Sequence, residues 1–540
     1  MGKLSRRLTE HLVIILVVVG TFLISPRITF DPIIIPRLGG LVLLATPLFI
    51  LILSSLRNLP VSVLLVSSLF IVWMLISSLF NSNPLERQLY GEFGRNTGVL
   101  TYFSLFIAFL AVTLICNQDF VERAVKTMVV CGLSISLYGL VQWVGLDPVE
   151  WTNQFEIPVM GTFGNPNFMS SFLGIYSTLL FHLMTKAKRE KLLLYLISVS
   201  LNLLLILETQ SIQGLVLYAI GLISSTFLKL SHHWSRSPKI YKFGALSMIV
   251  FFMVLLVSLR NRIFESVLSN ETLEIRWHYW TAGIKMGLQE PLFGLGFDSY
   301  GDWYRANRSN AAVKLTGESV VTNAAHNVFI DILVNGGIPL LLLYISLLTL
   351  IFKSAIRILR NKQKQDALYW ALVVAWICFV IQSLISINHL GLAIWGWFLG
   401  GTILGIDLNL TDKTEIYRSK GWPLIKLYVG FIVGAIVVGP PVAKDYFYMS
   451  ALESGLVVHI ERFTNSFPES TAYYHTTAEI FASNELKDKE LLILKAAVSF
   501  NERDFISWKR MLQSPLITVE EKRDMFLIAK LLEPRYSFND

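Results

Sequence analysis

Long apolar runs separated by short polar or basic links recur along the first 440 residues of the chain. A helix needs roughly 20 mostly apolar residues to cross the hydrocarbon core of a bilayer, and about thirteen runs reach or approach that length. They lie near residues 11–25, 38–56, 62–80, 98–116, 122–145, 168–184, 191–207, 211–230, 242–259, 326–352, 367–387, 389–406 and 422–440. This pattern predicts an all-α polytopic membrane protein with about 12 to 13 transmembrane helices.

The polar portion over residues 260–325 is the longest link between two apolar runs. It contains the stretch ETLEIRWHYWTAGIKMGLQ, whose apolar residues at 273, 277, 280 and 284 share one face of a helix. We therefore predict an amphipathic helix that lies along the membrane surface. It is followed by Pro291 and a glycine turn.

The last hundred residues, 441–540, change abruptly to a charged composition. Short amphipathic helices alternate there with polar turns, as in tetratricopeptide-type units, although a plain helical cap fits the pattern nearly as well. We predict a transmembrane domain over residues 1–440, including the outer loop 260–325, and an outer helical domain over 441–540. Helical repeats usually bind proteins, so this domain is expected to bind a partner or to have a placement role rather than a chemical one.

Basic residues gather in alternate links, which indicates the orientation of the chain. The N-terminal sequence MGKLSRRLTEHL has no small-residue cleavage site after it, so the first apolar run is interpreted as a retained helix. With the N-terminus inside, the inner links hold about 22 Lys and Arg and the short outer loops about four. Those inner links contain Arg57, Arg123 and Lys126, residues 186–191, 229–242 and 353–365, and Lys413, Arg418 and Lys420. The N-terminus is thus predicted to be cytoplasmic and residues 441–540 extracytoplasmic.

The composition supports a membrane location and argues against a nucleic-acid-binding protein and against a protein held together by disulfides or a metal. Hydrophobic residues make up 54% of the chain and charged residues 16%, with a mean hydropathy of +0.56, beyond the range of a soluble domain. The formal net charge of +8 is spread over the inner links, so no nucleic-acid partner is expected. The three cysteines have no ligand-like spacing and predict neither a disulfide nor a metal site.

Reactive side chains gather at the outer ends of the apolar runs, whereas the run interiors hold few ionisable residues. Ion-coupled transport normally needs charged groups near the midplane of the membrane, so this distribution argues against a transporter. The outer set comprises Arg95, Asn165, Asn167, Arg276, Arg305, Arg308 and His326.

His326 lies at the start of the apolar run HNVFIDILVNGGIPLLLLYISLL. An imidazole that titrates near neutrality can remove a proton from a sugar or serine hydroxyl, although a lone histidine at a helix end can also be a cap or an interfacial residue. Asp331 lies five residues further on, roughly 140° around a helix axis, so a local pair with His326 is not expected.

Two arginines and two asparagines complete the sequence-based site. Arg95 lies between glycines in YGEFGRNTGVLTY, and Arg276 lies in EIRWHYW. A guanidinium can hold two phosphate oxygens, but an arginine on the outer face can also contact lipid headgroups. In GTFGNPNFMSSFLGIY, Asn167 is interpreted as a helix N-cap, which leaves Asn165 to line a cavity.

Four segments in order resemble the O-antigen ligase and polymerase superfamily of bacterial membrane glycosyltransferases. They are GEFGRNTGVLTY, GTFGNPNFMSSFL, EIRWHYWTAGIKMGLQEPLFGLGFDSY and HNVFIDILVNGGIP, spanning residue 91 to about residue 340. His326, Asn327 and Gly337 match the His-Asn pair and the glycine eleven residues after the histidine that are typical of the ligases. Leu340 departs from the Gly, Thr or Tyr that is frequent there. Many members of the superfamily end in tetratricopeptide repeats.

The resemblance implies an enzyme of the bacterial cytoplasmic membrane. Its donor would be a glycan on undecaprenyl pyrophosphate, transferred without a metal or other cofactor, and with inversion, to an acceptor hydroxyl on a lipid-A core, another repeat unit or a protein. By match to the family, His326 would activate the acceptor and Arg276 would hold the pyrophosphate. Arg95 would be a second phosphate contact, and Asn165, Asn167 and Asn327 would contact the substrate.

Two other functions stay open at the level of sequence. A flippase or exporter of lipid-linked glycans would also need outward-facing arginines and many helices, but it should carry charges along a central path. A membrane scaffold would recruit assembly proteins through residues 441–540 and would leave His326 without a role.

Overall fold

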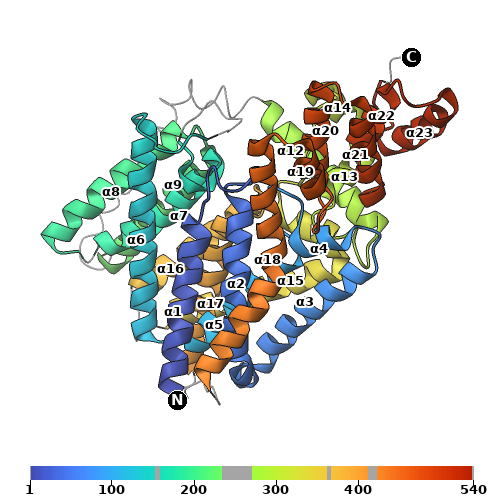
Figure 1. The fold of residues 1–540 in the computed structure, drawn as a ribbon. Coiled ribbons are helices and arrows are strands. Elements are labelled where there is room, and N and C mark those ends of the chain that lie inside the picture. Colours follow the sequence, from blue (N-terminus) through green and yellow to red (C-terminus); the bar gives the residue numbers. More distant parts are fainter. Residues whose placement is uncertain are drawn as a thin grey trace.

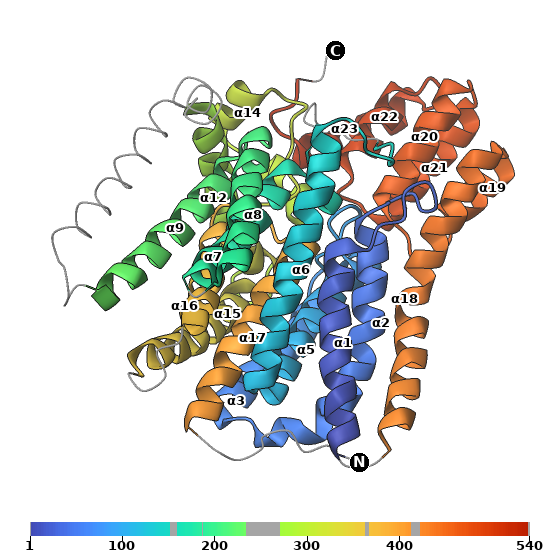
Figure 2. The same cartoon turned by 90° about the vertical axis from the view of Figure 1, so that its left-hand side faces the viewer.

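The computed structural model describes residues 2–151, 159–185, 187–233, 270–361, 367–411 and 422–537. Within these residues the chain forms helices and no strand, so the predicted all-α class of membrane protein is confirmed. The N-terminus and the C-terminal helices lie at opposite ends of the molecule (Figures 1 and 2).

Each predicted apolar segment within the described residues carries a helix, whereas segment 242–259 lies outside them. The helices are α1 (Gly2–Phe22), α2 (Ile34–Ile52), α3 (Val61–Leu79), α5 (Val99–Ile115), α6 (Gln118–Trp143), α7 (Pro166–Met184), α8 (Arg189–Glu208), α9 (Ile212–His233), α15 (Val328–Arg360), α16 (Ala367–Ser383), α17 (Leu390–Thr411) and α18 (Pro423–Ser454). Among the described helices, seven are long and apolar enough to span a membrane, and α5, α9 and α16 contain shorter apolar stretches. The chain is thus a multi-pass membrane protein.

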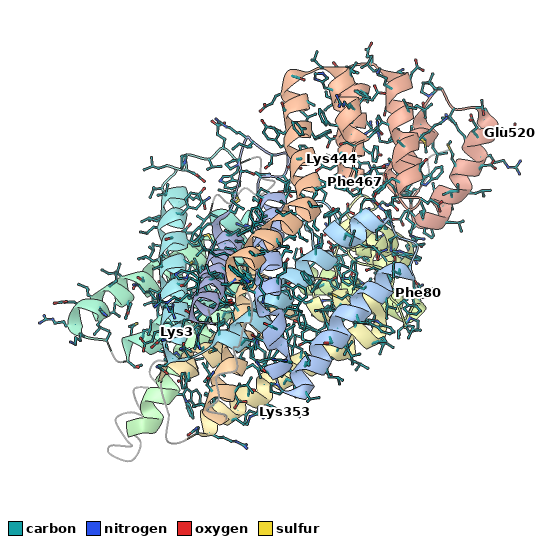
Figure 3. The ribbon with its side chains drawn as sticks, turned by 60° about the horizontal axis from the view of Figure 1, so that its bottom comes forward. Lys3, Phe80, Lys353, Lys444, Phe467 and Glu520 are labelled. Carbon is teal, nitrogen blue, oxygen red and sulfur yellow. The ribbon has the colours of Figure 1, made fainter. Side chains whose placement is uncertain are left out.

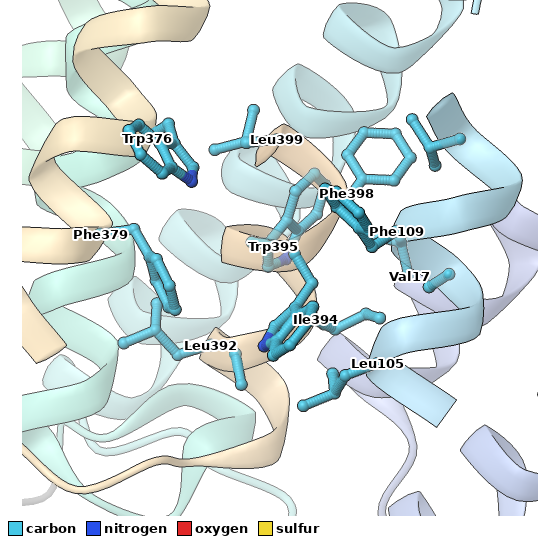
Figure 4. Packing of buried hydrophobic residues seen from close by; sticks show 14 of the residues in the cluster. Val17, Leu105, Phe109, Trp376, Phe379, Leu392, Ile394, Trp395, Phe398 and Leu399 are labelled. Carbon is cyan, nitrogen blue, oxygen red and sulfur yellow. The ribbon is translucent and has the colours of Figure 1, made fainter. Parts of the chain in front are cut away.

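Helix α17 forms the centre of the membrane part. It is apolar on all sides, as expected for a helix that other helices surround, and it packs against α1, α5, α15 and α16. Its Trp395 is almost fully buried among aromatic and aliphatic side chains (Figure 4). The Trp395 indole N–H donates to Thr21 Oγ1 of α1 at 3.0 Å, so the buried nitrogen has a partner.

Polar side chains inside the bundle join helices to one another. Asn202 of α8 donates to Ser177 Oγ of α7 at 2.9 Å and accepts from Ser136 Oγ of α6 at 2.6 Å. A buried amide with both ends bonded has a structural role.

Helix α15 has a kink at two glycines. Gly337 has φ +73° and ψ −173°, a conformation almost restricted to glycine, and a Cβ there would lie 2.4 Å from the carbonyl oxygen of Leu292. The turn at residues 291–295 fills the break, since Leu295 N donates to Val334 O at 2.7 Å and Ile338 N donates to Pro291 O at 2.8 Å. These two bonds at the kink therefore join residues 291–295 to the first part of α15.

Residues 270–325, which we call the outer portion, contain α12 (Asn270–Gln289), α13 (Tyr300–Asn307) and α14 (Asn310–Thr316). Short α4 (Leu85–Tyr90) is joined to α13 by the ion pair of Arg87 with Asp302. The helix predicted over 271–289 is thus confirmed as α12. Its buried Ala282 and Met286 contribute to a small core with α13 and α15, whereas Trp277 and Ile284 of the predicted apolar face are exposed. An exposed apolar face is what a helix on a membrane surface requires.

Residues 457–537 form a helical unit that we call the cap. Its helices are α19 (Val457–Thr464), α20 (Thr471–Ser483), α21 (Lys487–Phe500), α22 (Phe505–Gln513) and α23 (Val519–Leu532). Consecutive helices pack on one another and bury Tyr474, Phe481 and Ala497. The abrupt change of composition did indicate a separate group of helices. Its assignment to tetratricopeptide repeats stays a prediction.

The cap is joined to the membrane part through α18, which continues from the bundle to the cap (Figure 2). At the upper end of α18, the Lys444 ammonium donates to the carbonyl oxygens of Ser466 and Pro468 at 2.6 and 2.8 Å. Lys444 and Phe467 lie together at this junction, between the cap and the part of the molecule that holds Lys3 and Lys353, and Phe80 lies at one side (Figure 3). Exposed Glu520 lies on the far helix of the cap (Figure 3).

Candidate functional site

A cavity of about 1050 Å³ lies between the membrane part, the outer portion and the cap. Its wall includes the loop before α2, the loop between α4 and α5, the start of α7, the loop before α15 and two segments of the cap. His326, Arg95 and Asn165 all line it, so the structure brings together three of the side chains predicted from sequence.

His326 lies directly before α15 with a backbone φ of +53°, in the left-handed region that non-glycine residues seldom adopt. This conformation places the imidazole against the phenol ring of Tyr279 from α12, with ring centroids 5.6 Å apart and planes at 26°. Among the residues that the structure describes, none forms a hydrogen bond with the imidazole. The ring is therefore held by stacking, and its nitrogens stay available to a ligand in the cavity.

Burial, and then the positive charges of Arg276 and Arg95, lower the pKa of His326 to about 4. The imidazole is neutral at pH 7 and can accept a proton. Asp331 does not pair with it: its Oδ1 accepts from Ala325 N at 2.8 Å, as the predicted geometry requires.

Arg276 is half-buried on α12, one turn before Tyr279. Burial lowers its pKa. Within the described parts of the chain, no carboxylate lies within 4.0 Å of its guanidinium. Arg276 is not part of the cavity wall itself, but its charge acts on His326 from the side. A partly desolvated cation without a carboxylate beside it can pair with an anionic ligand.

Arg95 is buried and already neutralised within the protein. Its Nη2 lies 3.6 Å from Asp298 Oδ1 and 3.9 Å from Asp331 Oδ2, and its Nη1 donates to the carbonyl oxygen of Asn323. Asp298 also accepts from Thr97 N at 2.7 Å. Arg95 thus joins the α4–α5 loop, the turn before α13 and the loop before α15, and it contributes a polar edge to the cavity wall.

The three asparagines occupy helix starts. Asn165, and not Asn167, is the N-cap of α7: its Oδ1 accepts from Asn167 N at 2.9 Å, and Pro166 takes the first helical position. The prediction that Asn167 is the helix N-cap is therefore wrong. Proline favours the first helical position, so the N-cap residue lies directly before it. Asn165 also lines the cavity, as predicted. Asn327 caps α15 through bonds from Phe329 N and Ile330 N at 3.0 and 3.3 Å, and neither Asn167 nor Asn327 is part of the cavity wall.

The cap contributes cavity residues that sequence reasoning missed. The His475 Nε2 lies 2.8 Å from Asp504 Oδ2, and Ser507 Oγ donates to the same oxygen at 2.6 Å. Burial opposes charge on His475, but this bond to Asp504 raises its pKa. Arg503 lies next to this pair and also lines the cavity. These residues are separated from His326 by more than a hundred positions, so no local pattern could group them.

Arg305 of α13, included in the outer set, lines the cavity as well. Its guanidinium lies 3.7 Å from Glu533 of the cap and over the ring of Phe505 at 4.9 Å. Arg308 is fully buried and pairs with the same Glu533 at 2.7 Å. Arg308 therefore fastens the cap to α13 and does not face the cavity.

His389 is a second cavity histidine that the sequence did not single out. It lies between α16 and α17 and stacks on Phe168 with centroids 4.3 Å apart. Burial and the charge of Arg37 lower its pKa well below the usual value. Apart from an interaction with the Phe163 backbone, its ring has no polar partner in the described residues. A neutral imidazole thus forms part of the membrane side of the cavity.

The fold and the site define a class: a multi-pass helical membrane protein with a polar cavity at its outer-loop end, closed over by a helical cap. Residues 196–345 match the family model of O-antigen ligase. The match contains α12 with Arg276 and the loop with His326 and Asn327, and it excludes Arg95, Asn165, Asn167 and the cap. No curated protein matches the chain. The similarity supports a ligase-like transfer of glycans.

Proposed function

We propose that this protein is a bacterial membrane glycosyltransferase that transfers a glycan from undecaprenyl pyrophosphate to an acceptor hydroxyl. The lipid bilayer presents the donor, and transfer takes place on the outer side of the cytoplasmic membrane, with the N-terminus of the chain inside and the cap outside. The neutral His326 carries this proposal, because it lies in the cavity beside Arg276 within the segment that is similar to O-antigen ligases.

In the proposed reaction the acceptor oxygen attacks the anomeric carbon of the donor sugar with inversion, while the bond from that carbon to the pyrophosphate breaks. The acceptor proton goes to the imidazole of His326. The leaving undecaprenyl pyrophosphate gains negative charge, which Arg276 stabilises. In this scheme the guanidinium has the role that a metal ion has in other transferases of phosphorylated donors.

Arg95 is assigned a supporting role, because two carboxylates already neutralise it. It joins the three loops around His326, and the part of its guanidinium that lines the cavity can still contact a phosphate oxygen. Asn165 contacts the substrate from the start of α7. The acceptor is a sugar of a lipid-A core, the end of another repeat unit or a hydroxyl of a protein, which corresponds to a ligase, a polymerase or a protein glycosyltransferase.

The test compares surface glycans from a deletion strain that carries wild-type protein or the variant His326→Asn. Asparagine tolerates a positive φ better than alanine does, so this change removes the base while it preserves the backbone. We expect a loss of transfer of about 100-fold or more. Single repeat units in place of ladders identify a polymerase, and full-length glycan that stays on its lipid carrier identifies a ligase.

Undiminished glycan transfer by His326→Asn, with both proteins present in the membrane at equal amounts, contradicts the assignment of the base. If lipid-linked glycan instead accumulates on the cytoplasmic side of the membrane in the deletion strain, the protein is a flippase or exporter.

A further inference from the structure

The cap side of the cavity contains a cation, Arg503, that forms no ion pair within the described residues, although the charge of Asp302 acts on it. Arg503 lies in the turn between α21 and α22 and lines the cavity. In the described chain no carboxylate lies within 4.0 Å of its guanidinium, and its buried Nε has no hydrogen-bond partner. By contrast, Arg305 pairs with Glu533, and His475 pairs with Asp504.

The surroundings of Arg503 hold it in one position. Its guanidinium lies over the ring of Trp303 at 3.5 Å, and its backbone N–H donates to Asn501 Oδ1 at 3.1 Å. Asn501 in turn donates to Asp302 Oδ2 at 3.1 Å. A planar guanidinium fixed by stacking, with donors left over, suits a carboxylate or a phosphate better than a flexible lysine would.

The same wall carries groups typical of carbohydrate recognition. Phe505 lines the same wall with the guanidinium of Arg305 over its ring, and Asp504 and His475 form a fixed pair that can bond to hydroxyl groups. Charged and aromatic side chains that converge on a cavity fix both the orientation and the chemical type of a ligand.

We propose that this wall, formed by Arg503, Phe505 and the His475–Asp504 pair, is a binding subsite for an acidic sugar whose carboxylate or phosphate pairs with Arg503. The subsite rests on the proposed function, because a glycan must enter the cavity for the wall to contact it. It assigns to the cap a direct contact with carbohydrate.

The acidic sugar has two sources, the donor glycan and the acceptor. Both reach the wall by the same chemistry, since the pyrophosphate of the donor stays near the membrane with its lipid while the sugars extend outward. Saturation kinetics distinguish them. Arg503→Gln should raise the KM for the substrate that carries the acidic sugar and leave the KM for the other substrate unchanged.

The test uses the full chain, purified in an uncharged detergent, and two matched probes. One is a tetrasaccharide of β-1,4-linked glucuronic acid, and the other is cellotetraose, its neutral counterpart. We expect the wild-type protein to bind the acidic probe about tenfold or more tightly than the neutral one, because hydrogen bonds to a charged group contribute more than neutral bonds do. High salt should weaken this preference.

Arg503→Gln should abolish the preference, and Arg503→Lys should keep only part of it. Arg462→Gln, an exposed arginine of the same unit outside the cavity wall, is the matched control and should keep it in full. Equal binding of both probes by the wild-type protein, or an unchanged preference in Arg503→Gln, overturns the subsite. Because binding is measured without turnover, this result is independent of whether His326 is the base.

Discussion

The imidazole of His326 stacks on the ring of Tyr279 at a centroid distance of 5.6 Å, and this contact joins the loop before α15 to helix α12. The backbone carbonyl of Tyr279 accepts from the Tyr300 hydroxyl at 2.6 Å, so α13 fixes α12 in turn. The aromatic contact, rather than a carboxylate, sets the orientation of the imidazole.

Replacing Tyr279 by alanine should lower the transfer rate up to about 100-fold, because a base that is free to rotate is displaced from the acceptor hydroxyl. Tyr279→Phe keeps the ring and should retain nearly the full rate. The measurement is kcat with a labelled donor in both variants. Equal losses in the two variants would show that the hydroxyl matters and the stacking does not.

The pH profile of transfer should differ from that of an ordinary histidine. The pKa of His326 is lowered from 6.5 to about 4, so the base stays neutral down to about pH 5 and becomes protonated below that. The rate should therefore hold at pH 5.5, where a histidine with the usual pKa is roughly nine-tenths protonated. A rate that halves near pH 6.5 would contradict the lowered pKa. The groups that face the imidazole are Arg276, Arg95 and Tyr279.

The same pKa shift has a consequence for stability. A histidine that binds its proton less tightly in the folded state contributes stability above pH 6.5, and this contribution is lost as the pH falls from 6.5 through about 4. His326→Asn should lessen the loss of thermal stability over that window.

Substitutions of Arg276 and Arg95 should have different effects, because Arg276 binds substrate and Arg95 has a structural role. Arg276→Gln should lower kcat about 100-fold and leave the melting temperature nearly unchanged, because in the described chain it has no carboxylate partner to abandon. Arg95→Gln should destabilise the protein by about 3–5 kcal/mol, since Asp298 and Asp331 would remain buried without their cation. Thermal unfolding beside single-turnover kinetics distinguishes these outcomes, and the reverse pattern would exchange the two roles.

Arg87 should be required for the cap to pack stably against α4 and α13. It is buried in α4, lies 2.7 Å from Glu92 and pairs with Asp302, which also accepts from Asn501 of the cap. Arg87→Met should expose the cap to limited proteolysis, because it leaves two partly buried carboxylates, Glu92 and Asp302, without their cation. Arg523→Met, on the exposed side of α23, is the control and should be as resistant as the wild type. Equal resistance of both variants would show that other contacts suffice.

The helices of the membrane part followed from apolar runs because a helix that crosses a bilayer must be apolar along most of its length. The amphipathic helix α12 could be predicted because its apolar residues recur at helical spacing, as packing on one face requires. The N-cap of α7 was predicted at Asn167, two residues after its true position at Asn165. The rule that proline favours the first helical position could have placed it correctly.

The site could be predicted only in part. His326, Arg95 and Asn165 were identifiable because each lies beside a glycine-rich or helix-opening pattern near the outer end of an apolar run. His389, His475 and Arg503 have no such pattern, and only the packing of distant segments brings them to the same cavity. The sequence indicated helices in the cap, but the docking of those helices depends on long-range ion pairs such as Arg308 with Glu533.

The kink at Gly336 and Gly337 also separates two mechanical parts of α15. The turn at 291–295 is bonded to Val334 before the kink and to Ile338 directly after it, and the residues beyond Ile338 form the apolar span. A span adapts to a thicker or thinner bilayer by tilting, and a break in the helix can absorb that tilt. The position of His326 should therefore be insulated from lipid chain length, and transfer rates in vesicles of short-chain and long-chain lipids should be alike.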